Sequence, residues 1–138
     1  MTTLAEAIAL ASKAHKGQMD KQGAPYILHP LRIMLSLRDD GFSEIHQIVG
    51  VLHDVVEDTP VSLDEIKERF GDRVACAIEL LTHEKGVNYF DYIRAIRKDP
   101  IATEVKKRDL TDNSDFRRFF VGVAYSKYAK AMGILMGQ

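Results

Sequence analysis

Residues 51–59 of the sequence (VLHDVVEDT) carry four ionisable side chains within an otherwise apolar run. On a helix, residues four apart share a face, so His53 would stack with Glu57 and Asp54 with Asp58. Three carboxylates this close together repel one another unless a cation or shared protons compensate their charge. A solvated acidic face is the alternative interpretation, but the interleaved leucine and valine residues argue against it. The segment therefore indicates a site for a metal ion.

Two further segments carry residues that suit such a site. In residues 25–30 (PYILHP), His29 precedes a proline, and the residue before a proline favours an extended backbone. In residues 105–113 (VKKRDLTDN), Asp109 and Asn113 lie four apart, directly after a basic run. This second pattern fits a plain exposed charged helix as well as it fits a phosphate-binding helix with a metal ligand.

Helices must position these residues, because nearly every segment repeats apolar residues three and four apart, as in Leu4, Ile8 and Ala11. The sequence shows no alternating strand pattern flanked by hairpin turns, no internal repeat and no linker. It therefore predicts an all-α fold, a compact single-domain bundle of seven to eight short helices over residues 1–138. The expected helices reach to Gly17, run from Pro30 to Gly41 and from Ser43 to Pro60, cover 62–70 and 72–81, run from Asn88 or Asp91 to before Pro100, and cover 101–112 and about 119–136.

Length and composition narrow the classes of protein. The 138 residues suit one domain, and a formal net charge of −1 argues against a general nucleic-acid binder. Cys76 is the only cysteine, which excludes an intramolecular disulfide and multi-cysteine zinc modules. The longest run without Asp, Glu, Lys or Arg is the ten residues 22–31, whereas a membrane-spanning helix needs about 20 apolar residues. The N-terminus lacks the basic start of a secretory signal, so we expect a cytoplasmic protein without a membrane partner.

Five blocks in a fixed order, HKGQ, GAPYILHP, VLHDVVEDT, FGDRVA and VKKRDLTDN, resemble the HD-domain phosphohydrolases. More narrowly, they resemble the hydrolase domain of the RelA/SpoT alarmone enzymes. The resemblance runs from about Ala5 to Asn113 and more loosely to Tyr128. It implies an all-helical fold and a small-molecule nucleotide substrate, (p)ppGpp, from which the 3′-pyrophosphate is removed to leave GDP or GTP.

The resemblance also implies roles for individual residues. His29, His53, Asp54 and Asp109 match the metal ligands of the family, whose metal is usually manganese. Two imidazoles and two carboxylates suit a divalent ion of this kind.

Other matching positions imply catalysis and substrate binding. Glu57 and Asp58 match a catalytic acidic pair, and either of them can orient or deprotonate the attacking water. Asn113 matches an asparagine that contacts the nucleotide, Lys21 matches a basic residue of the substrate loop, and Tyr128 matches an aromatic residue that lines the pocket. Lys21 and Lys106 would offset the charge of the phosphate groups.

The chain departs from the family pattern in the loop before His29. Where the family places an arginine beside the purine, this chain has Asp20, so a stacking contact with the base is lost. An aspartate can accept hydrogen bonds from guanine or from adenine, which leaves (p)ppApp open as a substrate. The chain also has no room for the synthetase domain of long family members, so we expect it to degrade the alarmone and not to make it.

Two alternatives differ in class from an alarmone hydrolase. One is another HD-type nucleotide phosphohydrolase or phosphatase, which would release orthophosphate where the alarmone hydrolase releases pyrophosphate. The other is a non-catalytic nucleotide-sensing module, against which the intact set of acidic and histidine residues argues. The sequence indicates no oligomeric state.

Overall fold

The computed structural model describes residues 3–114 and 122–138, and the regular elements among these residues are all helices, which confirms the all-α prediction. They are α1 (Leu4–Ala14), α2 (Leu28–Asp39), α3 (Glu44–Leu52), α4 (Val55–Asp58), α5 (Leu63–Phe70), α6 (Asp72–Leu81), α7 (Tyr89–Arg97), α8 (Pro100–Asn113) and α9 (Gly122–Leu135). None of the helices in the described ranges is both long and apolar enough to cross a membrane.

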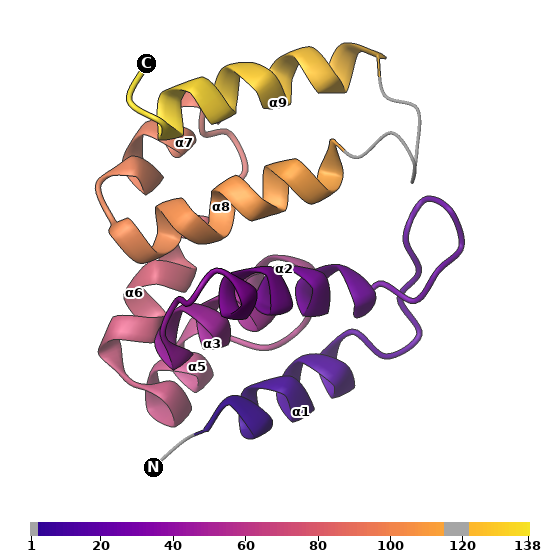
Figure 1. The fold of residues 1–138 in the computed structure, drawn as a ribbon. Helices are drawn as coiled ribbons and strands as arrows, with labels where there is room; N and C mark the ends of the chain where they lie inside the picture. Colours follow the sequence, from indigo (N-terminus) through magenta and orange to yellow (C-terminus); the bar gives the residue numbers. More distant parts are fainter. Residues whose placement is uncertain (1–2, 115–121) are drawn as a thin grey trace.

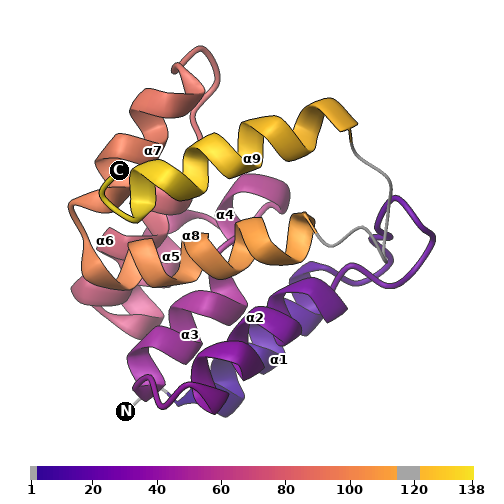
Figure 2. The same ribbon diagram turned by 45° about the horizontal axis from the view of Figure 1, so that its top comes forward.

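The helices pack in successive layers (Figure 1). α1 lies at one edge and contacts α3, and α3 packs along α2. α8 crosses α2 and α3, and α9 covers α7 and α8 at the opposite edge. Figure 2 brings the short helix α4 into view. The layers place α2, the end of α3 and α8 around one region of the interior.

Several element ends lie where the sequence places them. α6 begins at Asp72 and ends at Leu81. At the start of α5, the Ser62 hydroxyl accepts a hydrogen bond from the N–H of Glu65 at 3.1 Å. Such a cap satisfies a backbone donor that has no partner within the helix. The last helix, expected from about residue 119, is observed as α9, and residues 119–121 lie outside the described part of the chain.

A close approach of α2 and α3 depends on Gly50. A Cβ atom at this position would lie 2.8 Å from Cδ1 of Leu37 and 3.4 Å from Cγ2 of Ile33, both on α2. Leu37 and Ile33 are buried in the core. Because glycine has no side chain, the two helices pack closely enough for the residues at their ends to meet.

The single helix expected from Ser43 to Pro60 is divided in the structure. α3 ends at Leu52, α4 begins at Val55, and His53 and Asp54 form a turn between them. Nδ1 of His53 donates a hydrogen bond to the Gly50 carbonyl at 2.7 Å, so a side chain replaces the backbone N–H that normally binds this oxygen in a helix. The break lets His53 and Asp54 point to one place, which neighbouring residues on a continuous helix do not do.

Candidate active site

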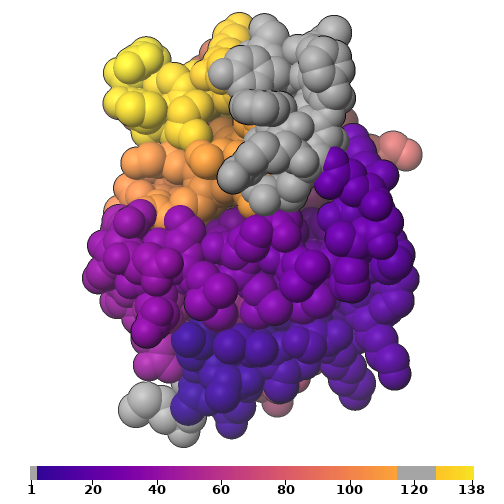
Figure 3. Space-filling view, turned by 45° about the vertical axis from the view of Figure 1, so that its right-hand side comes forward, coloured from indigo at the N-terminus to yellow at the C-terminus, as the bar shows by residue number. Residues whose placement is uncertain are grey.

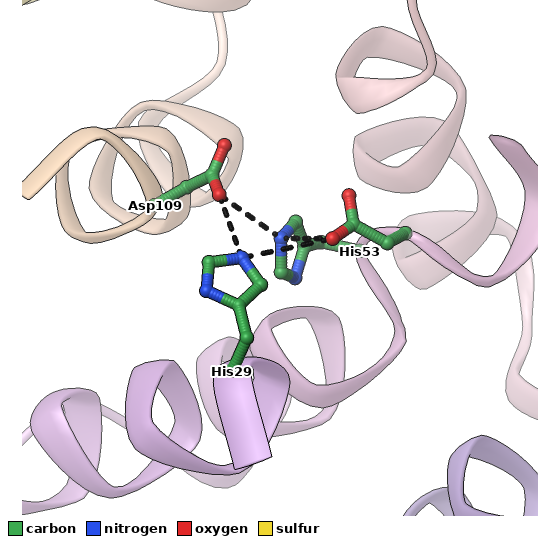
Figure 4. Close-up of side chains that lie close together, drawn as sticks. His29, His53 and Asp109 are labelled. Carbon is green, nitrogen blue, oxygen red and sulfur yellow. Dashed lines mark hydrogen bonds and ion pairs between the residues drawn. The ribbon is translucent and has the colours of Figure 1, made fainter. Parts of the chain in front are cut away.

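Four side chains from three parts of the fold converge at one point. His29 comes from the first turn of α2, His53 and Asp54 from the turn after α3, and Asp109 from α8. One nitrogen or carboxylate oxygen of each lies within 4.8 Å of all the others. Figure 4 shows His29, His53 and Asp109 pointing toward one another. The structure thus brings together the four residues that the sequence resemblance implies as metal ligands.

The distances within this cluster are short and involve the same four atoms. Nε2 of His29 lies 2.9 Å from Oδ1 of Asp109 and 3.7 Å from Oδ2 of Asp54. Nε2 of His53 lies 3.0 Å from Oδ2 of Asp54 and 3.4 Å from Oδ1 of Asp109. Two imidazole nitrogens and two carboxylate oxygens therefore face one common centre.

The backbone at His29 differs from the extended conformation expected before a proline. His29 lies within α2, which begins one residue earlier at Leu28. Pro30 is tolerated there because the N–H groups of the first helical turn have no partner within the helix. The rigid helix start, and not an extended connection, presents the His29 ring to the cluster.

The outer nitrogen of each histidine is bound, which directs the inner nitrogen to the cluster. Nδ1 of His53 donates to the Gly50 carbonyl, and Nδ1 of His29 donates to Oδ2 of Asp112 at 2.6 Å. Nε2 of His53 is buried and, among the described residues, close to two carboxylate oxygens but without a hydrogen bond of suitable geometry. A histidine that donates through one ring nitrogen presents the lone pair of the other to a metal ion. The buried Nε2 and the set of donors therefore fit a divalent cation.

The charged groups of the cluster shift one another's pKa values. Burial lowers the pKa of His53, but the charges of Asp54 and Asp109 outweigh burial and raise the pKa well above the usual histidine value. Burial raises the pKa of Asp109, but the Lys106 ammonium and the two histidines hold it well below the usual range. The opposite charges of the cluster thus stabilise one another, and a divalent cation held there would interact favourably with both carboxylates.

Asp109 is held at both oxygens by neighbours on its own helix. Nζ of Lys106 donates to Oδ2 at 2.8 Å, and Nδ2 of Asn113 donates to Oδ1 at 3.1 Å. The Lys106 side chain is nearly buried, and its ammonium lies 5.2 Å from the centre of the Tyr92 ring. The structure thus places Lys106 on a metal-ligand candidate rather than in the pocket described below.

The acidic pair lies beside the cluster, on α4. Asp54, Glu57 and Asp58 form a second group whose ligand atoms lie within 4.8 Å of one another. Oε1 of Glu57 accepts a hydrogen bond from the N–H of His83 at 2.6 Å, which fixes its orientation. Burial, with the charges of Asp54 and Glu57, raises the pKa of Asp58 to about 6. A carboxyl group with such a pKa can hold or release a proton near neutral pH, as acid–base catalysis requires.

A pocket of about 250 Å³ adjoins the cluster at His29. The loop between α1 and α2 contributes Asp20 and Lys21, and the two C-terminal helices contribute Asn113 and Tyr128. These are four of the five residues expected to bind the substrate. Figure 3 shows the face of the molecule on which this loop and α2 lie.

Asp20 has a structural task within the loop. Its Oδ1 accepts hydrogen bonds from the N–H groups of Gln22 and Ala24, both at 2.9 Å. Its pKa is lowered, chiefly by the Ala24 bond. Asp20 therefore presents a carboxylate that shapes the turn and also lines the pocket.

Three residues at the site are absent from the sequence-based set. Asp112 binds His29, Arg32 forms two hydrogen bonds with Asp112, and the Tyr26 hydroxyl donates to Oδ2 of Asp54. Asp112 lies three residues after Asp109 and Arg32 three residues after His29, so each occupies the next turn of the same helix. This spacing is the signal by which the sequence could have indicated Asp112 and Arg32 as neighbours of the ligand candidates.

The chain is similar in sequence to proteins described as enzymes of (p)ppGpp metabolism. The guanosine-3′,5′-bis(diphosphate) 3′-pyrophosphohydrolase of Aquifex aeolicus is 39% identical over 115 residues, covering 78% of this chain and 16% of that protein. The enzyme of the same description from Spiroplasma citri is 34% identical over 119 residues, covering 86% and 15%. The bifunctional (p)ppGpp synthase/hydrolase SpoT of Escherichia coli is 30% identical, covering 88% and 16%. The chain thus spans about one sixth of the length of these relatives.

Solved structures share the fold. A metazoan ortholog of SpoT that hydrolyses ppGpp matches with a TM-score of 0.80 at 24% identity, over 97% of this chain and 85% of that one. Protein lmo0812 of Listeria monocytogenes matches with a TM-score of 0.65 at 28% identity, over 85% and 83%. The family model described as HD domain matches residues 7–125 and so includes His29, His53, Asp54 and Asp109. With the matched range covering most of the sequence and the whole cluster, this chain belongs to the HD domain family.

Proposed function

We propose that this chain is a metal-dependent hydrolase that removes the 3′-pyrophosphate of (p)ppGpp and releases pyrophosphate with GDP or GTP. The observation that carries the proposal is the convergence of two imidazole nitrogens and two carboxylate oxygens within 4.8 Å, beside an acidic pair and a pocket. Relatives described as ppGpp 3′-pyrophosphohydrolases support the choice of substrate. We also propose that residues 1–138 form one domain and that this domain acts in the cytoplasm.

We propose manganese as the metal, held by His29, His53, Asp54 and Asp109. Two nitrogen and two oxygen donors suit such an ion and leave coordination positions for other ligands. A divalent ion in this place supplies positive charge against the phosphoryl oxygens and makes water more acidic.

Glu57 and Asp58 are the residues proposed to move protons. Glu57 is fixed through the N–H of His83 and is exposed on α4, where it can orient a water molecule and accept its proton. Asp58, with its pKa of about 6, can hold a proton and give it to the leaving oxygen. The two carboxylates thus have different environments, which is the arrangement that separates a base from an acid.

Binding of the nucleotide is assigned to the pocket beside His29. Lys21 is exposed at the rim, where its ammonium can offset phosphate charge. Asn113 bridges the pocket and the cluster, because it lines the pocket and also donates to Asp109. Tyr128 supplies an aromatic wall. Both guanine and adenine remain candidates for the base, so (p)ppApp is a second substrate to test.

The test is a panel of nucleotides incubated with the purified chain and manganese, with a chelator as the control. We expect ppGpp to yield GDP and pyrophosphate only when the metal is present. Release of orthophosphate would instead favour another HD-type phosphohydrolase. Absence of turnover on the whole panel, with metal bound, would contradict the proposal and favour a nucleotide-sensing module.

A further inference from the structure

Arg32 lines the pocket beside the four-residue cluster of His29, His53, Asp54 and Asp109. It lies on α2, one turn after His29, and lines the same pocket as Lys21 and Asn113. Its side chain is 35% exposed, in contrast to 11% for its partner Asp112. Arg32 is therefore half-buried at a place where a ligand of the pocket would touch it.

The orientation of Arg32 is fixed by two parallel hydrogen bonds. Nε donates to Oδ1 of Asp112 and Nη2 donates to Oδ2, both at 2.9 Å. Asp112 is itself held at Oδ2 by Nδ1 of His29 at 2.6 Å. A guanidinium bound to both oxygens of a carboxylate has a defined plane, so little rotational freedom remains to be lost when a ligand binds.

The same pairing determines which kind of ligand Arg32 suits. The Asp112 carboxylate offsets the charge of Arg32, which weakens its attraction for a phosphate group. The hydrogen bonds to Asp112 lie in the guanidinium plane and do not use its faces. A guanidinium face stacks well on a flat aromatic ring system. Lys21, whose compact charge at the rim is not planar, suits phosphate instead.

The walls near Arg32 also suit a nucleobase. Tyr26 and Tyr128 line the same pocket and supply aromatic surface. Aromatic rings and arginine side chains are the groups on which proteins stack unpaired bases. Taking the proposed nucleotide hydrolysis as its basis, we propose that Arg32 binds the nucleobase of the substrate through its guanidinium face and that Asp112 positions it for this contact.

The decisive variant is Arg32→Lys, which keeps a positive charge near Asp112 but removes the planar group. Arg32→Gln removes both. We expect each variant to raise the KM for ppGpp and the Kd for GDP roughly 5- to 100-fold, the worth of a stacking contact with a base. Inhibition by inorganic pyrophosphate, which has no base, should keep its wild-type inhibition constant. Manganese content, measured on the same samples, should also stay at the wild-type value.

Arg73 offers a matched control. It forms the same kind of double hydrogen bond, with both oxygens of Asp99 at 2.8 and 2.9 Å, and is 43% exposed. It does not line the pocket. Arg73→Gln should therefore leave the KM for ppGpp and the Kd for GDP unchanged.

Three results would overturn the assignment of Arg32 to the base. The first is a wild-type KM for ppGpp and Kd for GDP in both Arg32 variants. The second is wild-type constants in Arg32→Lys but not in Arg32→Gln, and the third is an equal loss of affinity for pyrophosphate. Either of the last two results would indicate that Arg32 contacts phosphate. Measurements on the wild-type protein distinguish a failure of the proposed hydrolase function from a failure of the Arg32 assignment. If it binds metal but leaves ppGpp intact, the hydrolase proposal fails, and calorimetric binding of GDP still decides for or against Arg32.

Discussion

Nδ1 of His29 and Oδ2 of Asp112 lie 2.6 Å apart, on the side of the imidazole ring that faces away from the other three candidate metal ligands. The contact joins α2 to α8 across 83 positions of the sequence. It fixes the tautomer of His29, because a proton on Nδ1 leaves the lone pair of Nε2 for the cluster. A carboxylate in this place also makes the imidazole a stronger ligand. Asp112 is thus a positioning residue for a candidate metal ligand.

Replacing Asp112 by asparagine should weaken metal binding. An amide cannot carry the negative charge that polarises the His29 ring, and we expect the affinity for manganese to fall about 10- to 100-fold. Calorimetric titration of the metal-free protein measures this change directly. Asp40→Asn is the control, since Asp40 pairs with Arg108 on the protein surface and does not contact the cluster. Equal manganese affinity in Asp112→Asn and the wild type would exclude the positioning role.

Removing a ligand candidate should remove the metal and the activity together. In His53→Ala or Asp54→Ala, one of four donors is lost, and we expect neither variant to retain manganese after dialysis or to turn over ppGpp. Elemental analysis and product assays on one sample measure both properties. Circular dichroism should still show a helical protein, because the apolar faces of the helices remain. Full manganese stoichiometry in both variants would refute the ligand assignment.

Changing the acidic pair should separate catalysis from metal binding. Glu57→Gln and Asp58→Asn keep shape but remove basicity, so kcat should fall about 10²- to 10⁴-fold in each variant if both carboxylates take part. Manganese content should stay unchanged, since neither residue belongs to the four-residue cluster of His29, His53, Asp54 and Asp109. Glu79→Gln, at an exposed position on α6, serves as the control. Normal turnover in one of the two variants would assign the chemistry to the other residue.

The sequence could predict what depends on local pattern. The bounds of α6 and the cap at Ser62 follow from residues within one or two helical turns. The division between α3 and α4 could not be predicted in this way, because it depends on the His53 ring reaching back to the Gly50 carbonyl. Periodicity treats His53 as one more helical residue.

The contacts around the site likewise could not be predicted from local sequence pattern. Residue type and order indicate His29, His53, Asp54 and Asp109, but only the fold shows which neighbours surround them. Lys106 is expected at a phosphate from its charge, whereas its ammonium lies against Asp109. Arg32 and Asp112 are separated by 80 positions, so no local pattern indicates their pairing.

Substitution by alanine should have opposite effects on the free energy of unfolding at Gly50 and at Gly133, because the two positions differ in packing. In Gly50→Ala, the added methyl group would lie 2.8 Å from Leu37, and we expect the free energy of unfolding to fall by about 1–3 kcal/mol through overpacking. Gly133 lies within α9, and a methyl group there would lie 3.6 Å from Oε1 of Gln138, an ordinary contact. Gly133→Ala should stabilise the protein by about 0.5–1 kcal/mol, because alanine favours the helix. Denaturant titration of both variants measures the difference, and equal signs would contradict it.

The ion pair between Arg73 and Asp99 should make stability depend on pH below neutrality. Asp99 caps α8, where its Oδ1 accepts hydrogen bonds from the N–H groups of Ile101 and Ala102. Burial raises the pKa of Asp99, but the Arg73 bonds and the two amides outweigh burial and lower the pKa below its usual value. A lowered pKa means that the charged carboxylate stabilises the folded state above the unfolded pKa, near 4. This contribution is lost as the pH falls through the lower folded-state pKa.

Asp99→Asn tests this dependence, since it keeps the capping oxygen and removes the charge. At pH 7 we expect the variant to be less stable by about 1 kcal/mol, the order expected for a partly exposed, doubly hydrogen-bonded ion pair. The difference should shrink as the pH is lowered below about 4, where Asp99 of the unfolded wild type becomes protonated, and vanish below the lower pKa of folded Asp99. Urea titrations of both proteins between pH 3 and 7 give the two curves. Asp91→Asn, which removes an exposed pair with Arg94, should change stability little at any of these pH values. A difference between Asp99→Asn and the wild type that stays constant down to pH 3 would show that the cap alone, without the charge, determines the effect.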